Sequence, residues 1–114
     1  MTSPIIQFID VHKSYQNGAQ PVTALEAVSL SLHAGDFATI MGPSGGGKTT
    51  LLNLLAGLDL PDRGQIILNG RKVSDLSDHD LTLLRRKEIG IVFQFFNLMP
   101  TLTVMENVEL PLLL

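Results

Sequence analysis

The stretch Gly42-Pro43-Ser44-Gly45-Gly46-Gly47-Lys48-Thr49 decides how this chain folds and what it binds. It fits the pattern G-x-x-x-x-G-K-[S/T] of a phosphate-binding P-loop. Its glycines let the backbone turn tightly, so that successive N–H groups can converge on phosphate oxygens. A helix that begins directly after such a loop points its positive N-terminal end at the same oxygens. The motif therefore predicts a phosphate-binding loop.

Three side chains at the end of the motif have separate expected roles. The Lys48 ammonium supplies a mobile positive charge for the β- and γ-phosphates, and the Thr49 hydroxyl can hold Mg²⁺ between them. The Thr50 hydroxyl is placed to donate to a phosphate oxygen. The candidate binding residues are Gly42, Pro43, Ser44, Gly45, Gly46, Gly47, Lys48, Thr49 and Thr50.

The residues on either side of the loop favour the P-loop interpretation. Phe37–Met41 is a short apolar run typical of a fully buried strand. Lys48–Gly57 is predicted to be a helix with a leucine-rich face, and Gly57 is a stop signal. A strand that leads into the loop and a helix that leaves it are the context in which the motif is specific.

Further strands are predicted outside this unit. Ile5–Val11 is rich in β-branched residues, and Val28–Leu32 alternates apolar with polar side chains, as a half-buried strand does. Ile66–Leu68 is closed by the turn signal Asn69-Gly70. Ile89–Phe93 is a second run typical of a buried strand.

Two further helices are predicted from their N-terminal signals. Ser77–Asp80 and Thr103–Glu106 both resemble capping boxes. The basic run Arg85–Lys87 suits the last turn of the first of these helices, and Pro111 is expected to kink the second or stop it early. Strands interspersed with helices indicate an α/β layered fold.

Composition excludes several classes of protein. The 114 residues carry a net charge of −3, so a general nucleic-acid-binding domain with its basic face is not expected. There is no cysteine, which excludes disulfides, zinc ribbons and thiol catalysis, and the three histidines are scattered. Because the sequence has neither an apolar run long enough to span a bilayer nor a signal-peptide pattern, we expect a cytoplasmic chain.

A P-loop alone does not specify the reaction. The N-K-x-D motif with which GTPases read guanine is absent from the sequence. A small-molecule kinase would need lid arginines; Arg85 and Arg86 could serve, although their place at a helix end already has a dipole explanation. A kinase of this kind and a stand-alone nucleotide-binding module without hydrolysis therefore remain as alternatives.

Over essentially its whole length the chain resembles the N-terminal part of the ATP-binding subunit of ABC transporters. Four stretches carry the resemblance: Val11–Tyr15 is similar to the A-loop, Gly42–Thr49 to the Walker A motif, Gly57–Ile66 to the link from the P-loop helix to the next strand, and Ile89–Gln94 with Asn97–Val108 to the Q-loop and the start of the helical subdomain. Leu84–Lys87 and Phe95–Leu98 are most similar to the macrolide-export and lipoprotein-release group.

This resemblance implies roles for residues that spacing alone does not assign. It implies ATP and Mg²⁺ as cofactors, with the ring of Tyr15 stacked on adenine. It gives Gln94 a place at Mg²⁺ and at the attacking water, so that Lys48 and Gln94 are the expected catalytic residues and Thr49 and Gln94 the expected metal ligands. Phe95 and Phe96 are expected in the core or against the transporter.

The resemblance also implies a fold and partners. The expected fold is a P-loop NTPase of the ABC type, here an antiparallel β region, the P-loop helix and a Q-loop strand. The sequence contains no Walker B, signature, D-loop or switch-histidine motif, so we expect residues 1–114 to be the N-terminal portion of one ATPase domain, inactive in hydrolysis by itself. Leu112–Leu114 would then be the edge of a core.

The intact parent is expected to pair with a second ATPase domain in a head-to-tail dimer that clamps two Mg-ATP molecules. It would drive transmembrane permease subunits from the inner face of the cell membrane.

Overall fold

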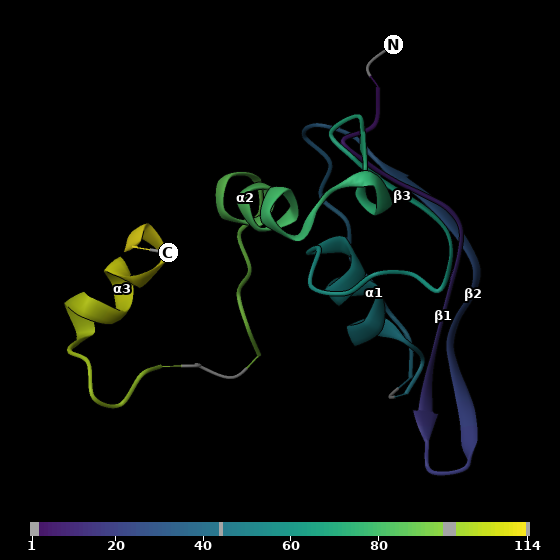
Figure 1. Ribbon diagram of the computed structural model, residues 1–114, viewed down its shortest axis with the longest axis horizontal. Helices are drawn as coiled ribbons and strands as arrows, with labels where there is room; N and C mark the ends of the chain where they lie inside the picture. Colours follow the sequence, from purple (N-terminus) through teal and green to yellow (C-terminus); the bar gives the residue numbers. More distant parts are fainter. Residues whose placement is uncertain (1–2, 44, 95–97, 114) are drawn as a thin grey trace.

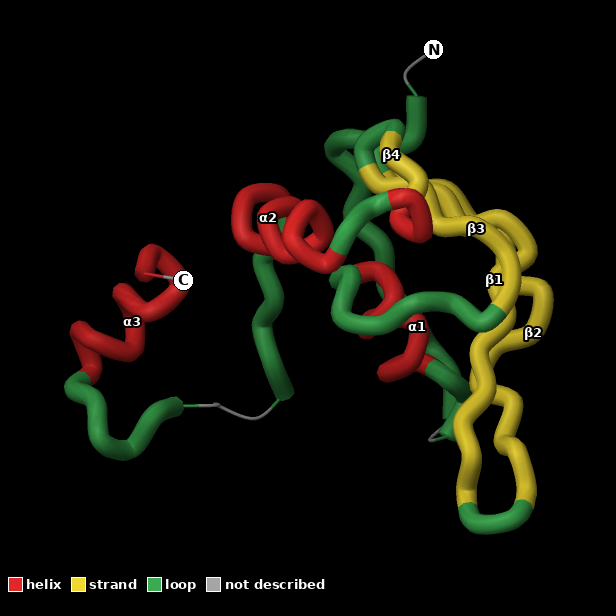
Figure 2. The backbone as a smooth tube through the Cα atoms, viewed as in Figure 1, coloured by secondary structure: helices red, strands yellow, loops and turns green. Residues whose placement is uncertain are grey.

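A four-stranded antiparallel sheet forms one side of the molecule in the computed structural model, which describes residues 3–43, 45–94 and 98–113 (Figures 1 and 2). Its strand order is β2-β1-β3-β4. The elements along the chain are β1 (Ile6–Asn17), β2 (Gln20–Leu32), α1 (Lys48–Leu55), β3 (Arg63–Leu68), β4 (Arg71–Lys72), a 3₁₀ turn η1 (Val73–Asp75), α2 (Asp78–Glu88) and α3 (Val104–Leu113).

The three predicted strands of the antiparallel region are confirmed, and two of them are much longer than the local pattern indicates. β1 and β2 form a long hairpin in which Asn17 pairs with Gln20. Within Val28–Leu32 the apolar side chains are half-buried and the serines exposed, as the alternation predicts. The strands extend further because partner strands supply hydrogen bonds that a sequence pattern does not reveal.

β-Bulges bend the hairpin. Asp10 and Ala27 adopt positive φ angles of 48° and 49°, where the pairing of β1 with β2 shifts register. A third shift leaves Ala24 unpaired between Leu25 and Thr23. Such bulges increase the local twist and re-aim the neighbouring residues.

The turn at Asn69-Gly70 joins β3 to β4, as predicted. Both turn residues have positive φ angles, 51° and 80°, and they form a two-residue hairpin loop. Positive φ at both positions is what the tight turn favoured between twisted strands requires.

The hydrophobic core lies between the sheet and the helices α1 and α2, which lie on the same side of it (Figure 1). Its buried side chains come from all of these elements and from η1: Phe8, Val11, Leu25, Leu54, Ile66, Leu68, Val73, Leu81 and Leu84. The helix predicted over Lys48–Gly57 is confirmed, but it ends at Leu55, and Gly57 adopts a positive φ of 72° just beyond it.

Of the two predicted capping boxes, the one at α3 forms in full, whereas at α2 the described residues show only the bond that Ser77 accepts. At α2 the Ser77 hydroxyl accepts a hydrogen bond from the Asp80 N–H at 3.1 Å. At α3 the Glu106 N–H donates to the Thr103 hydroxyl at 3.1 Å, and the Glu106 carboxylate accepts from the Thr103 N–H at 2.9 Å. Pro111 does not end α3, which continues to Leu113.

Two predicted strands, including the Q-loop strand, are wrong. Phe37–Met41 and Ile89–Phe93 contain no regular secondary structure, and three of their apolar side chains are nearly free of contact: Phe37 is 95%, Met41 87% and Val92 99% exposed. A run that is apolar on both faces becomes a strand only between neighbouring strands. Within the part of the chain that the structure describes, neither segment has a partner strand.

The C-terminal helix α3 is set apart from the sheet and from α1 and α2 (Figure 1). The radius of gyration is 15.9 Å, against about 13 Å for a compact domain of similar length. Across residues 3–43, 45–94 and 98–113, the helices are all too short or too polar to cross a membrane. The expectations for Phe95, Phe96 and Leu114 fall outside the described residues.

Candidate phosphate-binding site

The P-loop reaches α1 through a tight glycine turn that packs on strand β2. The Gly46 N–H donates to the Pro43 carbonyl at 3.1 Å, and Gly47 precedes α1 with a φ of 88°. A side chain at Gly47 would collide with the carbonyl oxygen of Ala24, the unpaired residue of the β2 bulge. Position 47 therefore needs glycine for its φ angle and for this close approach. Ser44 lies outside the described residues.

The N-terminus of α1 differs from those of the other two helices in the described part of the chain. No side chain caps it, and its first turn contains no acidic residue. By contrast, α2 has the Ser77 cap and two aspartates in its first turn, and α3 has the Thr103 cap and Glu106. Among the helices of the described residues, α1 alone therefore has an N-terminus whose N–H groups and dipole are compensated by no cap and no first-turn acid, which suits an anion.

The Lys48 side chain folds back over the loop. Its ammonium group donates to the carbonyl oxygen of Gly42 and, at 3.0 Å, to that of Pro43. The positive charge is therefore held on the P-loop at the N-terminal end of α1.

A cavity of about 400 Å³ lies at this end of α1 and brings together residues that are distant in sequence. Gln94 lines it together with the P-loop residues and the first turn of α1. Three residues of β2 that sequence reasoning missed complete the wall. The lining residues are Val22, Thr23, Ala24, Gly45, Gly47, Lys48, Thr49, Thr50 and Gln94.

Tyr15 does not line this cavity, but it is adjacent to the wall. Across the β1–β2 hairpin it pairs with Val22, which does line the cavity. Directly paired residues carry their side chains on the same face of a sheet. The Tyr15 side chain is 41% exposed, and its hydroxyl donates to Asp59 at 2.9 Å.

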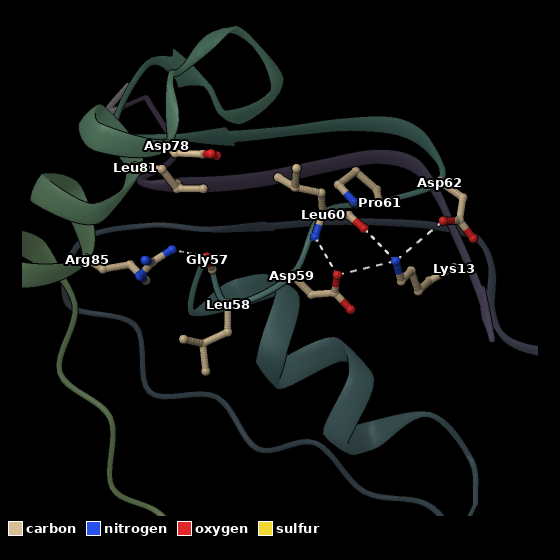
Figure 3. A pocket seen from close by; sticks show the side chains of 10 residues that line it. All are labelled: Lys13, Gly57, Leu58, Asp59, Leu60, Pro61, Asp62, Asp78, Leu81 and Arg85. Carbon is tan, nitrogen blue, oxygen red and sulfur yellow. Dashed lines mark hydrogen bonds and ion pairs between the residues drawn. The ribbon is translucent and has the colours of Figure 1, made fainter. Parts of the chain in front are cut away.

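A second cavity, of about 440 Å³, lies at the other end of α1 and is lined by the loop that follows this helix (Figure 3). Here the ammonium group of Lys13 lies between two carboxylates, 3.3 Å from Asp59 and 3.4 Å from Asp62. On the opposite side Arg85 donates to the Gly57 carbonyl at 2.8 Å. Arg85 thus holds α2 to the end of α1, and this contact gives it a structural role in place of the lid role.

The charges of this cluster stabilise one another. Burial opposes the ionisation of Lys13, but the hydrogen bonds and charges of Asp59 and Asp62 outweigh it and raise the Lys13 pKa above its ordinary value. Burial likewise opposes ionisation of Asp59, but hydrogen bonds from Leu60, Tyr15 and Lys13 lower its pKa. The Asp62 pKa is lowered chiefly by the hydrogen bond from the Ser14 N–H.

A G-x-x-x-x-G-K-T loop that opens a helix beside a cavity defines the class of P-loop proteins. Within that class, the family model described as ABC transporter matches residues 25–111. The chain therefore belongs to the ABC transporter ATP-binding family.

Similar proteins and structures agree with this assignment. The macrolide export ATP-binding/permease protein MacB of Bdellovibrio bacteriovorus is 49% identical over 109 residues, which are 96% of this chain and 17% of that protein. The ABC transporter ATP-binding protein MJ0796 of Methanocaldococcus jannaschii is 48% identical and is covered to 46% of its length. The dimeric structure of the MJ0796 cassette superposes on 95% of this chain with a TM-score of 0.89. The chain thus spans about half the length of such an ATP-binding protein.

Proposed function

We propose that this chain binds the phosphates of ATP at its P-loop and contributes that site to the ATPase of an ABC transporter. The observation that carries the proposal is the open N-terminus of α1, which has no side-chain cap and no acidic residue in its first turn. Its N–H groups, together with the Lys48 ammonium, border a cavity large enough for a polyphosphate. α2 and α3 are both capped, so this feature is specific to the P-loop helix.

Each polar side chain around the cavity has a role in this proposal. Lys48 exchanges its bonds to loop carbonyls for bonds to the β- and γ-phosphates, and Thr50 donates to a phosphate oxygen. Thr49 and Gln94 offer a hydroxyl and an amide oxygen, which are the hard oxygen ligands that Mg²⁺ prefers. Thr49 and Gln94 would hold the ion, which would supply positive charge that offsets part of the charge on the phosphates.

Tyr15 is proposed as the platform for adenine. Tyr15 pairs with Val22, a residue of the cavity wall, and is 41% exposed, and both observations support access of a flat base to its ring. An aromatic ring can stack on a base without forming hydrogen bonds to the edge of that base.

The reaction and partners of the whole protein are inferred from relatives. One relative is named as a macrolide export ATP-binding/permease protein, and the MJ0796 cassette has been solved as a dimer in a post-hydrolysis state with ADP and Pi. We infer that this chain is the N-terminal portion of such an ATPase domain. With a second ATPase domain it would hydrolyse ATP and drive a permease from the inner face of the membrane. By itself the chain is expected to bind nucleotide weakly and not to turn it over.

Calorimetry with Mg-ATP tests the proposed site. Lys48→Ala is expected to weaken binding about tenfold or more, because it removes charge-assisted hydrogen bonds to phosphate. Lys87→Ala is a matched control, since this exposed lysine lies at the far end of α2. Equal loss in both variants, or no loss in Lys48→Ala, would contradict phosphate binding at the P-loop.

A further inference from the structure

The loop that follows α1 is tied to strand β1 by a compact network around Asp59. The two oxygens of this carboxylate have different partners. Oδ1 accepts from the Leu60 N–H at 2.8 Å and lies 3.3 Å from the Lys13 ammonium, whereas Oδ2 accepts from the Tyr15 hydroxyl at 2.9 Å. Because Oδ1 is fixed by the backbone and by a charge, Oδ2 points at the phenol from a defined position.

Lys13 braces the same arrangement from strand β1. Its ammonium group donates to the Leu60 carbonyl at 2.9 Å and lies 5.4 Å from the centroid of the Tyr15 ring, within the range of a cation–π interaction. The Lys13 side chain is only 12% exposed. Tyr15 is therefore held at its hydroxyl by Asp59 and at its ring by Lys13.

This anchoring has a consequence for the aromatic ring. A tyrosine side chain can rotate about two torsion angles. Because Tyr15 is 41% exposed, the residues packed around it do not fully restrict this rotation. The hydrogen bond to Asp59 fixes the far end of the side chain and so selects one orientation. Asp59 lies in the loop after α1, the helix that begins at the P-loop and ends at Leu55. The P-loop and the loop that contacts the ring are thus at the two ends of one helix.

We propose that Asp59 is a positioning residue that holds the Tyr15 ring in the orientation in which it stacks on the base of a bound nucleotide. This inference rests on the proposed function, because it requires Tyr15 to be the adenine platform. Asp59 touches neither nucleotide nor metal in this role; it lowers the ordering cost of stacking by fixing the ring before the nucleotide binds.

The neighbouring carboxylate offers a matched comparison. Asp62 also pairs with Lys13, at 3.4 Å, and accepts from the Ser14 N–H at 2.8 Å, but its bonds go to the backbone and side chain of Ser14 and not to Tyr15. If the network only holds the loop to the strand, loss of either carboxylate has the same effect. If Asp59 positions the ring, only the loss of Asp59 weakens the binding of the base.

The test compares the affinities of the chain for Mg-ATP and for inorganic tripolyphosphate, which has no base. Asp59→Ala is expected to weaken ATP about fivefold, the size of one typical hydrogen bond, and to leave tripolyphosphate unchanged. Asp62→Ala is expected to leave the ratio of the two affinities unchanged. Tyr15→Phe keeps the ring and removes only an exposed hydroxyl, so it should reproduce the loss, and the Asp59→Ala/Tyr15→Phe double variant should lose no more than either alone.

Fluorescence gives a second readout that does not depend on binding. Tyr15 is the only tyrosine, and the chain contains no tryptophan. A tyrosine whose hydroxyl donates to a carboxylate is quenched, so Asp59→Ala should raise the emission while Asp62→Ala should not. Far-UV circular dichroism identifies any variant that has lost its fold, in which case Tyr15→Phe carries the affinity comparison.

The outcomes separate the two proposals. If the unsubstituted chain binds neither ATP nor tripolyphosphate, the proposed function fails, and the positioning role fails with it. If both ligands bind and Tyr15→Phe leaves the ATP affinity unchanged, the function stands and the positioning role is overturned. Equal changes in emission and in the affinity ratio for Asp59→Ala and Asp62→Ala would also overturn it, because they would indicate a purely structural network.

Discussion

Residues 6–88 and residues 98–113 are held by different kinds of interaction. In the first region, strands and helices distant in sequence share one core, and every buried hydrophobic side chain among the described residues lies there. In the second region none of the side chains described is buried. Its order comes from the Thr103–Glu106 box and from the Asn107 side chain, which bonds to Met99 on both its N–H and its carbonyl.

The difference shows which structure short-range signals can produce by themselves. A capping box and side-chain bonds between near neighbours define α3 without tertiary packing, although an isolated helix of this length has little stability in water. The sheet and its helices instead depend on burial between distant residues, which is the dominant favourable contribution to folding. The two regions should therefore respond differently to substitution.

The largest expected effect is that of Phe8→Ala. Phe8 is 1% exposed at the centre of the core, and truncation of such a residue costs about 3–5 kcal/mol in the free energy of unfolding. Val108→Ala on α3, where the side chain is 70% exposed, should change it by about 0.5 kcal/mol or less. Denaturant unfolding followed by circular dichroism measures both, and similar costs would show that the two regions do not differ.

A smaller effect is expected from Gly64→Ala in β3. Gly64 has a φ of 90°, and an added Cβ would overlap the carbonyl of Asp10 at the β1 bulge. The expected cost is about 2 kcal/mol or more, from strained backbone and steric overlap together. Gly70→Ala is the control, since its φ of 80° is similar but the space around it is open. The difference between the two variants measures the close packing of β3 on the bulge, and equal costs would mean that packing contributes nothing.

The smallest expected effect is a loss of stability at low pH, to which one carboxylate in each region contributes. The pKa of Asp62 is lowered chiefly by the Ser14 N–H, and that of Glu106 chiefly by the Thr103 N–H. A carboxyl whose pKa is lowered in the folded state stabilises that state at pH values above the ordinary pKa of the group. That ordinary pKa is near 3.8 for Asp62 and 4.5 for Glu106. This stabilisation is lost as the pH falls from that value through the folded pKa.

The two accepting carboxylates can be followed separately by NMR of their amide partners. The Ser14 amide shift should titrate with a midpoint below 3.8 and cease to do so in Asp62→Asn. The Thr103 amide shift should titrate below 4.5 and cease to do so in Glu106→Gln. If either substitution abolished both titrations, the two regions would be coupled, contrary to the comparison above.

Much of the site was predictable because its chemistry is local in sequence. The P-loop pattern identifies Gly47, Lys48 and Thr49, and a turn of this kind must lie at the start of α1. Gln94 required the family resemblance, since a single glutamine after an apolar run has no signal of its own. The structure places it in the same cavity as Thr49. The wall formed by Val22–Ala24 was not predicted, because it depends on how β2 packs against the loop.

The errors have a common physical cause. Phe37–Met41 and Ile89–Phe93 have the composition of buried strands, but a strand is completed by hydrogen bonds to neighbours that its own sequence does not contain. Asp59 was likewise unremarkable in sequence, because its role depends on Tyr15, 44 residues away. A local sequence pattern therefore predicts neither strand pairing nor a contact between side chains that are distant in sequence.

By itself the sequence determined the P-loop motif, the helix caps, the Asn69-Gly70 turn and the family, because each of these depends on residues a few positions apart or on motifs kept in order. Only the tertiary structure decided the bulges, the close approach of Gly47 to Ala24, the cavity wall and the anchoring of Tyr15 by Asp59. These features arise where chain segments distant in sequence meet, and their geometry is set by the packing of the whole core.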